Sequence, residues 1–520
     1  MKKAVFVQIP GTPVWPEDIF ENVPYGAGAL VSYLRKHIKK GDTDFIIPDY
    51  HKVNILGDEA LIDYLTSLKP DILLFTVYLW NVERSLYIAE KIKEKLDLLV
   101  VFGGPEVYPD NQWLVEKDVV DYFVSGEGEI ALFEFMSGNV GRERFISSPP
   151  TPSYLSPYLS SALDIKKGYP IYIDSQRGCS FKCAFCLYSK GSSNIRAMPL
   201  KDVKNVLRLA RLRGAKDIIF VDPTFNLHPH FKSLLEVLVS ENRDGFFRYH
   251  AELKPHLLKD DEISLINSAG FSDIEVGLQT VHAHTQRRLG CYVPLDKFGH
   301  ALSRLSRKIN IKLDLISCLP GEGIEELEES MSYVKRYFSY SDVYLYHLLA
   351  LPGSRIRSMD GIDYEKVPPY LVIKNGAMDA GDLRKIKNLF LEYFGEELDP
   401  FPDMYDLYKM RRDLNYIKFG KLHSNDATSN VKLFNLVEFE SGMTVTHISD
   451  IVQRLTSSNP FSTFVFYIRE GRRQDLLLDA IVSSSRLTLS QATNRMFTFT
   501  RASLANFRIG LISRRLSSPL

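Results

Sequence analysis

Apolar runs and amphipathic stretches alternate through the first 140 residues. Short runs rich in β-branched and apolar residues, typical of buried strands, fall at residues 4–9, 45–47, 72–78, 98–102 and 122–124. Between them, apolar positions recur with helical spacing at residues 26–37, 58–68, 82–95 and, more weakly, 110–116. Strands separated by helices pair in parallel, because each connection crosses one face of the sheet. We therefore predict a doubly wound α/β domain over residues 1–140.

The strand and helix order of this region is that of a flavodoxin-like sheet, whose ligands bind at the carboxyl ends of the strands. Two glycine-rich loops fall at those ends, GGPE at residues 103–106 and GEGE at 126–129. Glycine lets a bulky ligand approach the backbone closely. The same loops are also explained as tight turns between strand and helix, so on their own they leave the presence of a ligand open.

A second series of strands and helices follows a change in composition. Residues 147–164 are rich in Ser, Pro and Tyr, which is typical of a linker, and we assign the linker to residues 141–168. Strand patterns then occur at residues 171–175, 217–221, 247–251, 274–277, 313–317 and 343–349. Helical patterns lie between them, as at residues 200–213 and 324–338. These repeats predict a partial (β/α)6 barrel over residues 169–390.

The periodicity weakens over residues 391–520, which we predict to form an accessory domain. Residues 464–468 and 476–481 have the pattern of ordered elements. The segment from residue 483 to the end is polar and free of acidic residues, so we expect a mobile tail there. Its basic residues are typical of a solvated face.

Composition limits the function classes. The chain has 64 Lys and Arg against 64 Asp and Glu, and this balance argues against a protein that coats nucleic acid. The N-terminal apolar run stops at Pro10, too early for a signal peptide, and no run reaches the roughly 18 apolar residues of a membrane span. Five cysteines make a disulfide framework a poor explanation. We therefore expect a cytoplasmic protein with no membrane or nucleic-acid partner.

Three of the five cysteines lie in one short stretch, GCSFKCAFCLY, after the first strand of the second series. A structural zinc site needs four ligands, and no His or further Cys occurs between Gly168 and Pro199 to complete one locally. A disulfide would leave one thiol unpaired. An iron-sulfur cluster accepts three thiolates and then has one iron without a protein ligand. This spacing therefore favours a cluster with an open iron.

The cysteine spacing, with Phe185 before the third cysteine and a partial barrel behind it, resembles the radical S-adenosylmethionine enzymes. The resemblance implies that Cys179, Cys183 and Cys186 hold a 4Fe-4S cluster whose open iron binds S-adenosylmethionine. Reductive cleavage of that molecule would release a 5′-deoxyadenosyl radical, so the cofactors would carry the difficult chemistry. The resemblance covers residues 169 to about 388.

Further segments are similar to the strands of that family: IIFVDPTFN, YHAELKP, EVGLQT, LDLISCLPGE and LLALPGSRI. The similarity implies that the residues near S-adenosylmethionine are Phe185, Asp222, Thr224, Glu252, Gln279, Ile316 and Leu351. The fifth segment departs from the usual pattern, because Cys318 stands where glycine is common. We interpret Cys291 and Cys318 as packing residues, since free cysteine behaves as a small hydrophobic residue.

The order of a flavodoxin-like domain, a linker and the cysteine loop is similar to the cobalamin-binding subclass of these enzymes. The similarity places cobalamin between the first domain and the barrel mouth, near Phe75, Thr76, Tyr78, Trp80, Gly103, Gly104, Glu106, Gly126 and Glu127. The D-x-H-x-x-G motif, whose histidine ligates cobalt in many cobalamin domains, is absent after the first strand. His51 follows the second strand instead, and we interpret it as a surface loop residue. A domain that kept its fold and lost its ligand remains an alternative.

The combined resemblance implies cobalamin-dependent C-methylation of an unactivated carbon. Radical cyclisation, rearrangement or oxidation without methyl transfer is the first alternative, and a non-catalytic iron-sulfur protein is the second. The expected partners are a small-molecule or peptide substrate and an electron donor such as flavodoxin or ferredoxin. The sequence identifies neither the substrate nor the catalytic side chains beyond the cofactor ligands.

Overall fold

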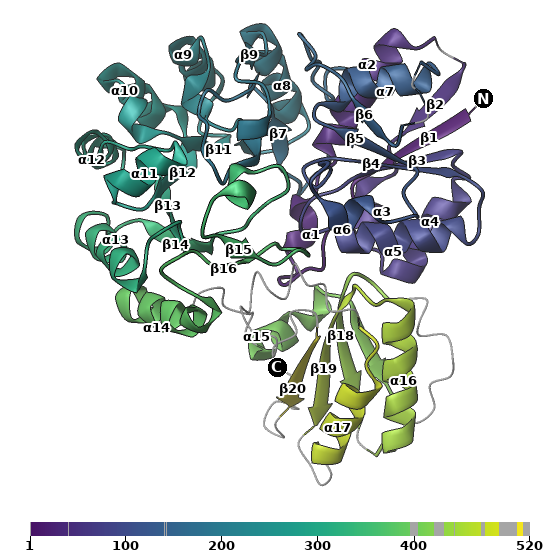
Figure 1. Ribbon diagram of the computed structural model, residues 1–520. Coiled ribbons are helices and arrows are strands. Elements are labelled where there is room, and N and C mark those ends of the chain that lie inside the picture. Colours follow the sequence, from purple (N-terminus) through teal and green to yellow (C-terminus); the bar gives the residue numbers. More distant parts are fainter. Residues whose placement is uncertain are drawn as a thin grey trace.

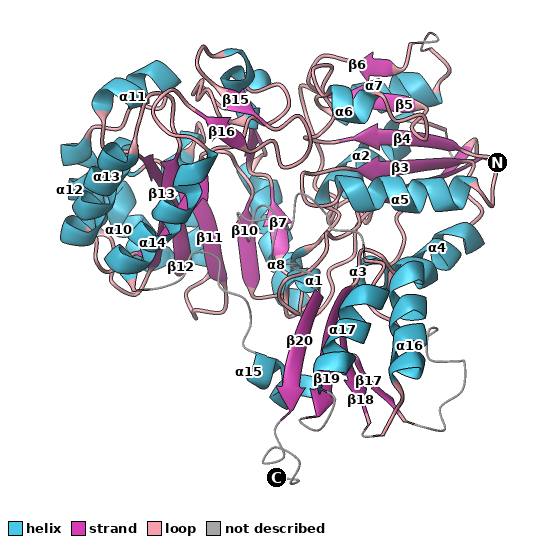
Figure 2. Cartoon of the chain, turned by 60° about the horizontal axis from the view of Figure 1, so that its bottom comes forward, coloured by secondary structure: helices cyan, strands magenta, loops and turns pink. Residues whose placement is uncertain are grey.

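Three parallel sheets follow one another along the described part of the chain in the computed structural model (Figure 1). The structure describes residues 2–39, 41–139, 141, 143–395, 404–420, 431–440, 442–469, 474–487 and 507–512. The first two sheets lie side by side, and the third lies below them in both views (Figures 1 and 2). None of the helices described has the length and apolar character needed to cross a membrane.

The first sheet has the strand order β2-β1-β3-β4-β5-β6, with parallel pairing throughout. Its strands are β1 (Lys2–Val7), β2 (Thr43–Ile46), β3 (Ile72–Thr76), β4 (Leu99–Gly103), β5 (Tyr122–Ser125) and β6 (Phe145–Ser147). Its helices are α1 (Asp18–Glu21), α2 (Tyr25–His37), α3 (Tyr50–Ile55), α4 (Asp58–Ser67), α5 (Val82–Lys93), α6 (Gln112–Val115) and α7 (Gly128–Met136). This is the predicted doubly wound fold, in which the strand order changes direction between β1 and β3.

Apolar side chains on both faces of this sheet are buried under helices. Helices α2 and α7 cover one face, where Leu34 and Leu132 pack against Phe6 of β1. Helices α4 and α5 cover the other face, where Leu65 and Ile88 join a second apolar cluster. Strands buried on both faces have almost continuous apolar sequences, which is why they were recognisable.

The first sheet is larger than the sequence analysis predicted. Strand β6 pairs with β5 and carries the sheet past residue 140 to Ser147. The short helices α1 and α3 were also missed, as was α7. Residues 130–136, in α7, are apolar at nearly every position, so they show no helical period.

The second sheet has the strand order β14-β13-β12-β11-β10-β7, again parallel throughout. Its strands are β7 (Ile171–Ile173), β10 (Asp217–Phe220), β11 (Arg248–Leu253), β12 (Phe271–Gln279), β13 (Asn310–Ser317) and β14 (Asp342–His347). The α-helices around it are α8 (Leu200–Leu212), α9 (Phe231–Glu241), α10 (Asp260–Ala269), α11 (Ala283–Leu289), α12 (Leu295–Arg304), α13 (Ile324–Tyr337) and α14 (Leu383–Phe394). The six predicted strands are confirmed.

Two short ribbons and several 3-10 helices accompany the second sheet. The ribbons are antiparallel and pair β8 (Gln176–Arg177) with β9 (Arg196–Ala197) and β15 (Asp363–Tyr364) with β16 (Val372–Lys374). The 3-10 helices are η1 (Leu187–Lys190), η2 (Phe225–Leu227), η3 (Pro255–Leu257), η4 (Arg355–Ser358), η5 (Ala380–Asp382) and, before the third sheet, η6 (Met410–Arg412).

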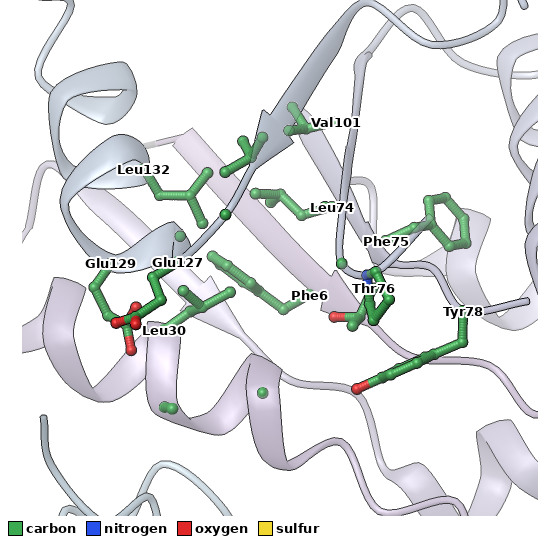
Figure 3. A pocket seen from close by; sticks show the side chains of 18 of the residues that line it. Phe6, Leu30, Leu74, Phe75, Thr76, Tyr78, Val101, Glu127, Glu129 and Leu132 are labelled. Carbon is green, nitrogen blue, oxygen red and sulfur yellow. The ribbon is translucent and has the colours of Figure 1, made fainter. Parts of the chain in front are cut away.

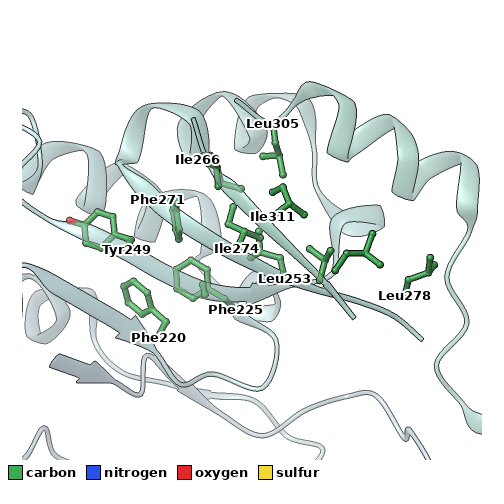
Figure 4. Packing of buried hydrophobic residues seen from close by; sticks show 14 of the residues in the cluster. Phe220, Phe225, Tyr249, Leu253, Ile266, Phe271, Ile274, Leu278, Leu305 and Ile311 are labelled. Carbon is green, nitrogen blue, oxygen red and sulfur yellow. The ribbon is translucent and has the colours of Figure 1, made fainter. Parts of the chain in front are cut away.

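The two faces of the second sheet differ in polarity. Figure 4 shows apolar residues such as Ile274, Ile311 and Leu253 packed between the strands and the outer helices. Residues alternating with them, including Glu252 and Asp314, face the other way, because successive side chains of a strand point to opposite faces. The barrel therefore has an apolar outer face and a polar inner face.

The third sheet consists of β17 (Tyr416–Phe419), β18 (Phe434–Phe439), β19 (Thr463–Arg469) and β20 (Phe507–Ile512), in this order and in parallel. Its helices are α15 (Met404–Lys409), α16 (Val445–Ser458) and α17 (Gln474–Ser484). The accessory region is thus a small α/β unit. Strand β20 lies inside the segment that we expected to be mobile, and that expectation is wrong for those six residues. Residues 488–506 and 513–520 of that segment lie outside the described residues.

Candidate active site

The three clustered cysteines lie on the loop that joins β8 to β9. Residue Gly178 begins this loop with φ +94°, and a Cβ there would come within 2.4 Å of the Asn194 carbonyl oxygen. Glycine is therefore required where the loop closes. Cys179 and Cys183 are buried, Cys186 is half-buried, and none of them forms a disulfide.

Two of the clustered cysteines, Cys183 and Cys186, have raised pKa values. Burial raises the pKa of Cys183 to about 11 and that of Cys186 to about 12, and the neighbouring cysteines add to both shifts. A coordinating metal deprotonates such thiols. Across the described ranges, no three or more His, Cys, Asp or Glu side chains converge as a group that could hold a metal ion. The three thiols of the loop are therefore close together in the sequence, but their side chains do not converge on one point where a single small ion would bind.

Asp222 supports the segment that leads into the cysteine loop. Its Oδ2 accepts a hydrogen bond from the Ser175 hydroxyl at 2.6 Å, and its Oδ1 accepts one from the Gln176 backbone N–H at 2.7 Å. Burial raises the pKa of Asp222 well above its usual range. The side-chain amide of Gln176 donates through Nε2 to the Thr224 backbone carbonyl at 2.7 Å. Two of the predicted S-adenosylmethionine contacts thus brace the strand before the cysteines.

Gln279 has the features expected of a side chain that binds a ligand. It lies at the end of β12 with φ +71°, a conformation that costs a non-glycine residue free energy. Its Oε1 is buried and accepts no hydrogen bond within the described residues. An orphaned buried acceptor is uncommon, so this oxygen fits a polar ligand at the carboxyl end of the barrel strands.

The other predicted S-adenosylmethionine contacts lie in different surroundings. Glu252 faces the barrel interior, and burial raises its pKa to about 7, opposed in part by Lys254. Phe185 and Ile316 are half-buried against the barrel core. Leu351 packs instead with Leu79 of the first domain and with Tyr370. The structure leaves the binding roles of these residues as predictions.

A hollow of about 800 Å³, its open mouth included, lies at the carboxyl ends of the first sheet (Figure 3). Seven of the nine residues predicted to lie near cobalamin line it: Phe75, Thr76, Tyr78, Gly103, Gly104, Gly126 and Glu127. The glycines keep this hollow free of side chains. A Cβ at Gly26 or Gly126 would meet no protein atom within 4 Å. The hollow therefore has open space beside Gly26 and Gly126 that a ligand could occupy.

Two of the predicted cobalamin neighbours do not line the hollow. Trp80 is 48% exposed and stacks on Tyr78 with ring centroids 4.6 Å apart. Glu106 is buried and accepts a hydrogen bond from the Tyr370 hydroxyl at 2.7 Å. Glu106 therefore joins the first domain to the segment after the barrel.

The sequence analysis missed the contribution of β1, α2 and α7 to the hollow. The additional lining residues include Phe6, Gly26, Leu30, Glu129 and Leu132. Arg177, two residues before Cys179, lines it as well. The polar GEGE sequence was the available signal for Glu129, whereas the apolar positions resembled ordinary core.

His51 is not among the residues that line the hollow. It is exposed, as we predicted, but it lies in helix α3 and not in a loop. Its Nδ1 lies 3.0 Å from the Tyr169 hydroxyl.

Comparisons with known proteins assign both regions. The profile of the radical SAM superfamily matches residues 173–334, and that of the B12 binding domain matches residues 21–135. The cysteine loop falls within the first match, and every residue given as lining the hollow except Phe6 falls within one of the two matches. The two families match separate parts of one chain, in the predicted order.

Curated relatives are distant. The cobalamin-dependent radical SAM methyltransferase TokK of Streptomyces tokunonensis is 20% identical over 342 residues, which are 57% of this chain and 49% of that protein. The anaerobic magnesium-protoporphyrin IX monomethyl ester cyclase of Rubrivivax gelatinosus is 24% identical over 402 residues, 68% of this chain and 71% of that protein. The chain thus spans about half the length of the first relative.

Solved structures share the fold. The radical S-adenosylmethionine methyltransferase TsrM of Kitasatospora setae, with tryptophan and a SAM analog bound, has a TM-score of 0.55 at 17% identity and covers 72% of this chain and 80% of its own. The cobalamin-dependent S-adenosylmethionine radical enzyme OxsB, with aqua-cobalamin and S-adenosylmethionine bound, has a TM-score of 0.56 at 13% identity, covering 80% and 69%. The chain therefore belongs to the radical SAM superfamily, among the members with a B12-binding domain, and its cofactors are a 4Fe-4S cluster, S-adenosylmethionine and cobalamin.

Proposed function

We propose that the protein methylates an unactivated carbon atom of a small molecule or peptide. When bound, the cluster supplies the electron that cleaves S-adenosylmethionine to a 5′-deoxyadenosyl radical, and methylcobalamin supplies the methyl group. The observation that carries the proposal is the adjacency of the two sites: Arg177 lines the hollow, and Cys179 follows two residues later. A substrate carbon between the sites would be within reach of both.

The chain's own residues would hold and separate these reactants. Cys179, Cys183 and Cys186 would bind the cluster and leave one iron for S-adenosylmethionine. Gln279 would offer its unpaired oxygen to a donor group of S-adenosylmethionine. The stacked rings of Tyr78 and Trp80, at the edge of the hollow, would limit the entry of water.

The reaction requires an electron donor, because the cluster must be reduced before each cleavage of S-adenosylmethionine. A small flavodoxin or ferredoxin fits this requirement. The cluster loop would be its docking region, since half-buried Cys186 lies nearer the surface than the two buried cysteines.

Radical cyclisation is the second candidate function. It is favoured by the relative that is named as a cyclase, which this chain matches over a larger share of both lengths than it matches TokK. This reaction would use the same cysteine loop and S-adenosylmethionine site without transfer of a methyl group.

The test uses protein purified without oxygen and reconstituted with iron, sulfide and hydroxocobalamin. It is incubated with titanium(III) citrate, S-adenosylmethionine carrying a deuterated methyl group, and a metabolite extract of the organism that encodes it. We expect S-adenosylhomocysteine, 5′-deoxyadenosine and a product that carries the deuterated methyl, all absent with Cys183→Ala. Formation of 5′-deoxyadenosine without a labelled product would reject methylation in favour of cyclisation or another radical reaction. Absence of 5′-deoxyadenosine would indicate a non-catalytic iron-sulfur protein.

A further inference from the structure

A two-stranded ribbon closes the base of the cysteine loop and carries two arginines. Strands β8 and β9 pair antiparallel with Arg177 directly opposite Arg196. The residues between the two strands, 178–195, include all three clustered cysteines. Side chains of directly opposite residues in an antiparallel pair lie on the same face. Both guanidinium groups therefore leave the base of the loop on one side.

Both guanidinium groups contact the GEGE loop of the B12-binding domain. Arg177 Nη1 lies 2.6 Å from Glu129 Oε1 and 3.4 Å from Glu127 Oε2. Arg196 Nη1 donates to Glu127 Oε2 at 2.9 Å, and its Nη2 contacts Glu127 Oε1. A guanidinium that binds both oxygens of a carboxylate fixes the angle as well as the distance between them. In Figure 3 the carboxylates of Glu127 and Glu129 point in the same direction from the end of α7.

The surroundings leave these arginines little freedom. Arg177 Nε also binds Asp174 Oδ2 at 2.6 Å, and its guanidinium lies over the Tyr154 ring at 4.3 Å. Arg196 Nη1 donates to the Thr151 carbonyl at 2.5 Å. The Arg177 side chain is 16% exposed and that of Glu129 is 4% exposed. Partly buried charges are screened less by salt than exposed ones, so these contacts hold at ordinary ionic strength.

We call the contacts of Arg177 and Arg196 with Glu127 and Glu129 the arginine clamp. The segment that carries the clamp also contacts a second wall of the hollow. The backbone N–H of Asp174 donates to the hydroxyl of Tyr25 at 3.3 Å, and Tyr25 begins α2, which supplies Gly26 and Leu30 to the lining. The base of the cysteine loop is thus tied to both α2 and α7. These two helices cover the same face of the first sheet.

We propose that Arg177 and Arg196 are positioning residues that fix the cluster loop relative to the cobalamin hollow. None of the four charged side chains belongs to the apolar clusters of the two domains. Their ion pairs connect the two sites, because Arg177 lines the hollow and its strand ends at the cysteine loop. The distance and orientation between cluster and corrin therefore depend on this clamp. The proposal requires both cofactors to be bound but does not depend on methyl transfer.

The test measures the distance between the cofactors. Protein loaded with the cluster and cob(II)alamin, then reduced so that both carry an unpaired electron, is examined by pulsed electron paramagnetic resonance. We expect one narrow distance distribution in the wild type and a broad or shifted one in Glu127→Gln, with cobalamin affinity about tenfold weaker. Arg196→Lys keeps the positive charge but loses the guanidinium group that contacts both oxygens of Glu127. Its distance distribution should be intermediate between those of the wild type and Glu127→Gln. Asp217→Asn breaks an equally close pair with Arg248, far from the interface, and should match the wild type.

The outcomes are decisive in each direction. A narrow distribution at the wild-type distance in Glu127→Gln would overturn the proposal. If Glu127→Gln does not retain the cluster, Arg196→Lys decides, and an unchanged distribution in that variant would overturn the proposal as well. Failure of methyl transfer in the wild type would reject the proposed function and leave the measured distances unaffected, so the two failures are distinguishable.

Discussion

Three glycines that line the hollow of the first domain, Gly26, Gly104 and Gly126, allow the effect of backbone strain to be separated from the effect of lost space. Gly104 has φ +114°, and a Cβ there would lie 2.6 Å from the Val77 carbonyl oxygen. Gly126 has φ +83°, but its Cβ would meet no atom within 4 Å. Gly26 lies in α2 without a positive φ, and it has the same free space. Alanine at position 104 would therefore combine backbone strain with a clash. Alanine at position 126 would introduce strain alone, and alanine at position 26 would introduce neither.

The expected changes in the free energy of unfolding follow from these differences. A left-handed backbone costs an L-residue about 1–2 kcal/mol. At Gly104 the clash adds to this cost, since the neighbouring atom belongs to the backbone and cannot rotate away. We expect Gly104→Ala to lower the free energy of unfolding by about 2 kcal/mol or more. Gly126→Ala should lower it by about 1 kcal/mol, and Gly26→Ala should raise it by up to about 1 kcal/mol because alanine favours helix.

The assay has two readouts. Urea unfolding of the cofactor-free protein ranks the three variants, and an absorbance titration with hydroxocobalamin measures binding. Methyl groups at Gly26 and Gly126 should weaken cobalamin affinity about tenfold, because overpacking a well-filled site costs about 1–3 kcal/mol. Our reasoning is refuted if Gly104→Ala is as stable as Gly26→Ala. It is also refuted if Gly26→Ala and Gly126→Ala both bind cobalamin with the wild-type affinity.

Three further predictions concern the barrel. Cys183→Ala should lose the cluster and all cleavage of S-adenosylmethionine, and iron and sulfide close to wild-type content would contradict the ligand assignment. Gln279→Leu removes the orphaned oxygen and should weaken S-adenosylmethionine binding about tenfold in calorimetry without loss of stability, whereas unchanged binding would exclude the contact. Burial lowers the pKa of His347 from 6.5 to about 4, so its contribution to stability is complete above pH 6.5 and is lost as the pH falls toward 4. His347→Gln should therefore lose less stability than the wild type between pH 7 and 5 in urea unfolding, and equal losses would count against this origin of the acid sensitivity.

The strands of both large sheets were predictable because their local sequence indicates that they are buried. Runs such as β3 are apolar at nearly every position, and parallel strands covered by helices on both faces have this composition. Among the elements that escaped prediction, β6 is short and α7 is apolar at nearly every position, and neither shows a period that distinguishes strand from helix.

Candidate cluster ligands could be named from the sequence because three cysteines at fixed spacing carry their own signal, and their binding of the cluster stays a prediction. The polar contacts around them were not, because hydrogen-bond partners are set by tertiary structure. Asp222 was expected beside S-adenosylmethionine, yet both of its oxygens accept hydrogen bonds from residues that precede the cysteine loop. Glu106 was expected beside cobalamin, and it is bound by Tyr370, a residue 264 positions away in the sequence.

The third sheet supports the first domain from a side that does not touch the hollow. Within the part of the chain that the structure describes, the residues that line the hollow end at Arg177, and the third sheet supplies none of them. One of its contacts is with Asp58, whose Oδ2 accepts a hydrogen bond from the Phe461 backbone N–H at 2.8 Å. Within the first domain, Asp58 pairs with buried Arg84, and Arg84 Nη1 donates to the Pro10 carbonyl at 3.1 Å.

The same sheet holds the loop that follows β1. The Thr463 hydroxyl donates to the Pro13 carbonyl at 2.6 Å, in the loop between β1 and α1. Helix α1 in turn reaches the barrel, where the Tyr172 hydroxyl donates to the Glu21 carbonyl at 2.9 Å. The third sheet therefore holds the loop between β1 and α1, and α1 connects that loop to the first strand of the barrel.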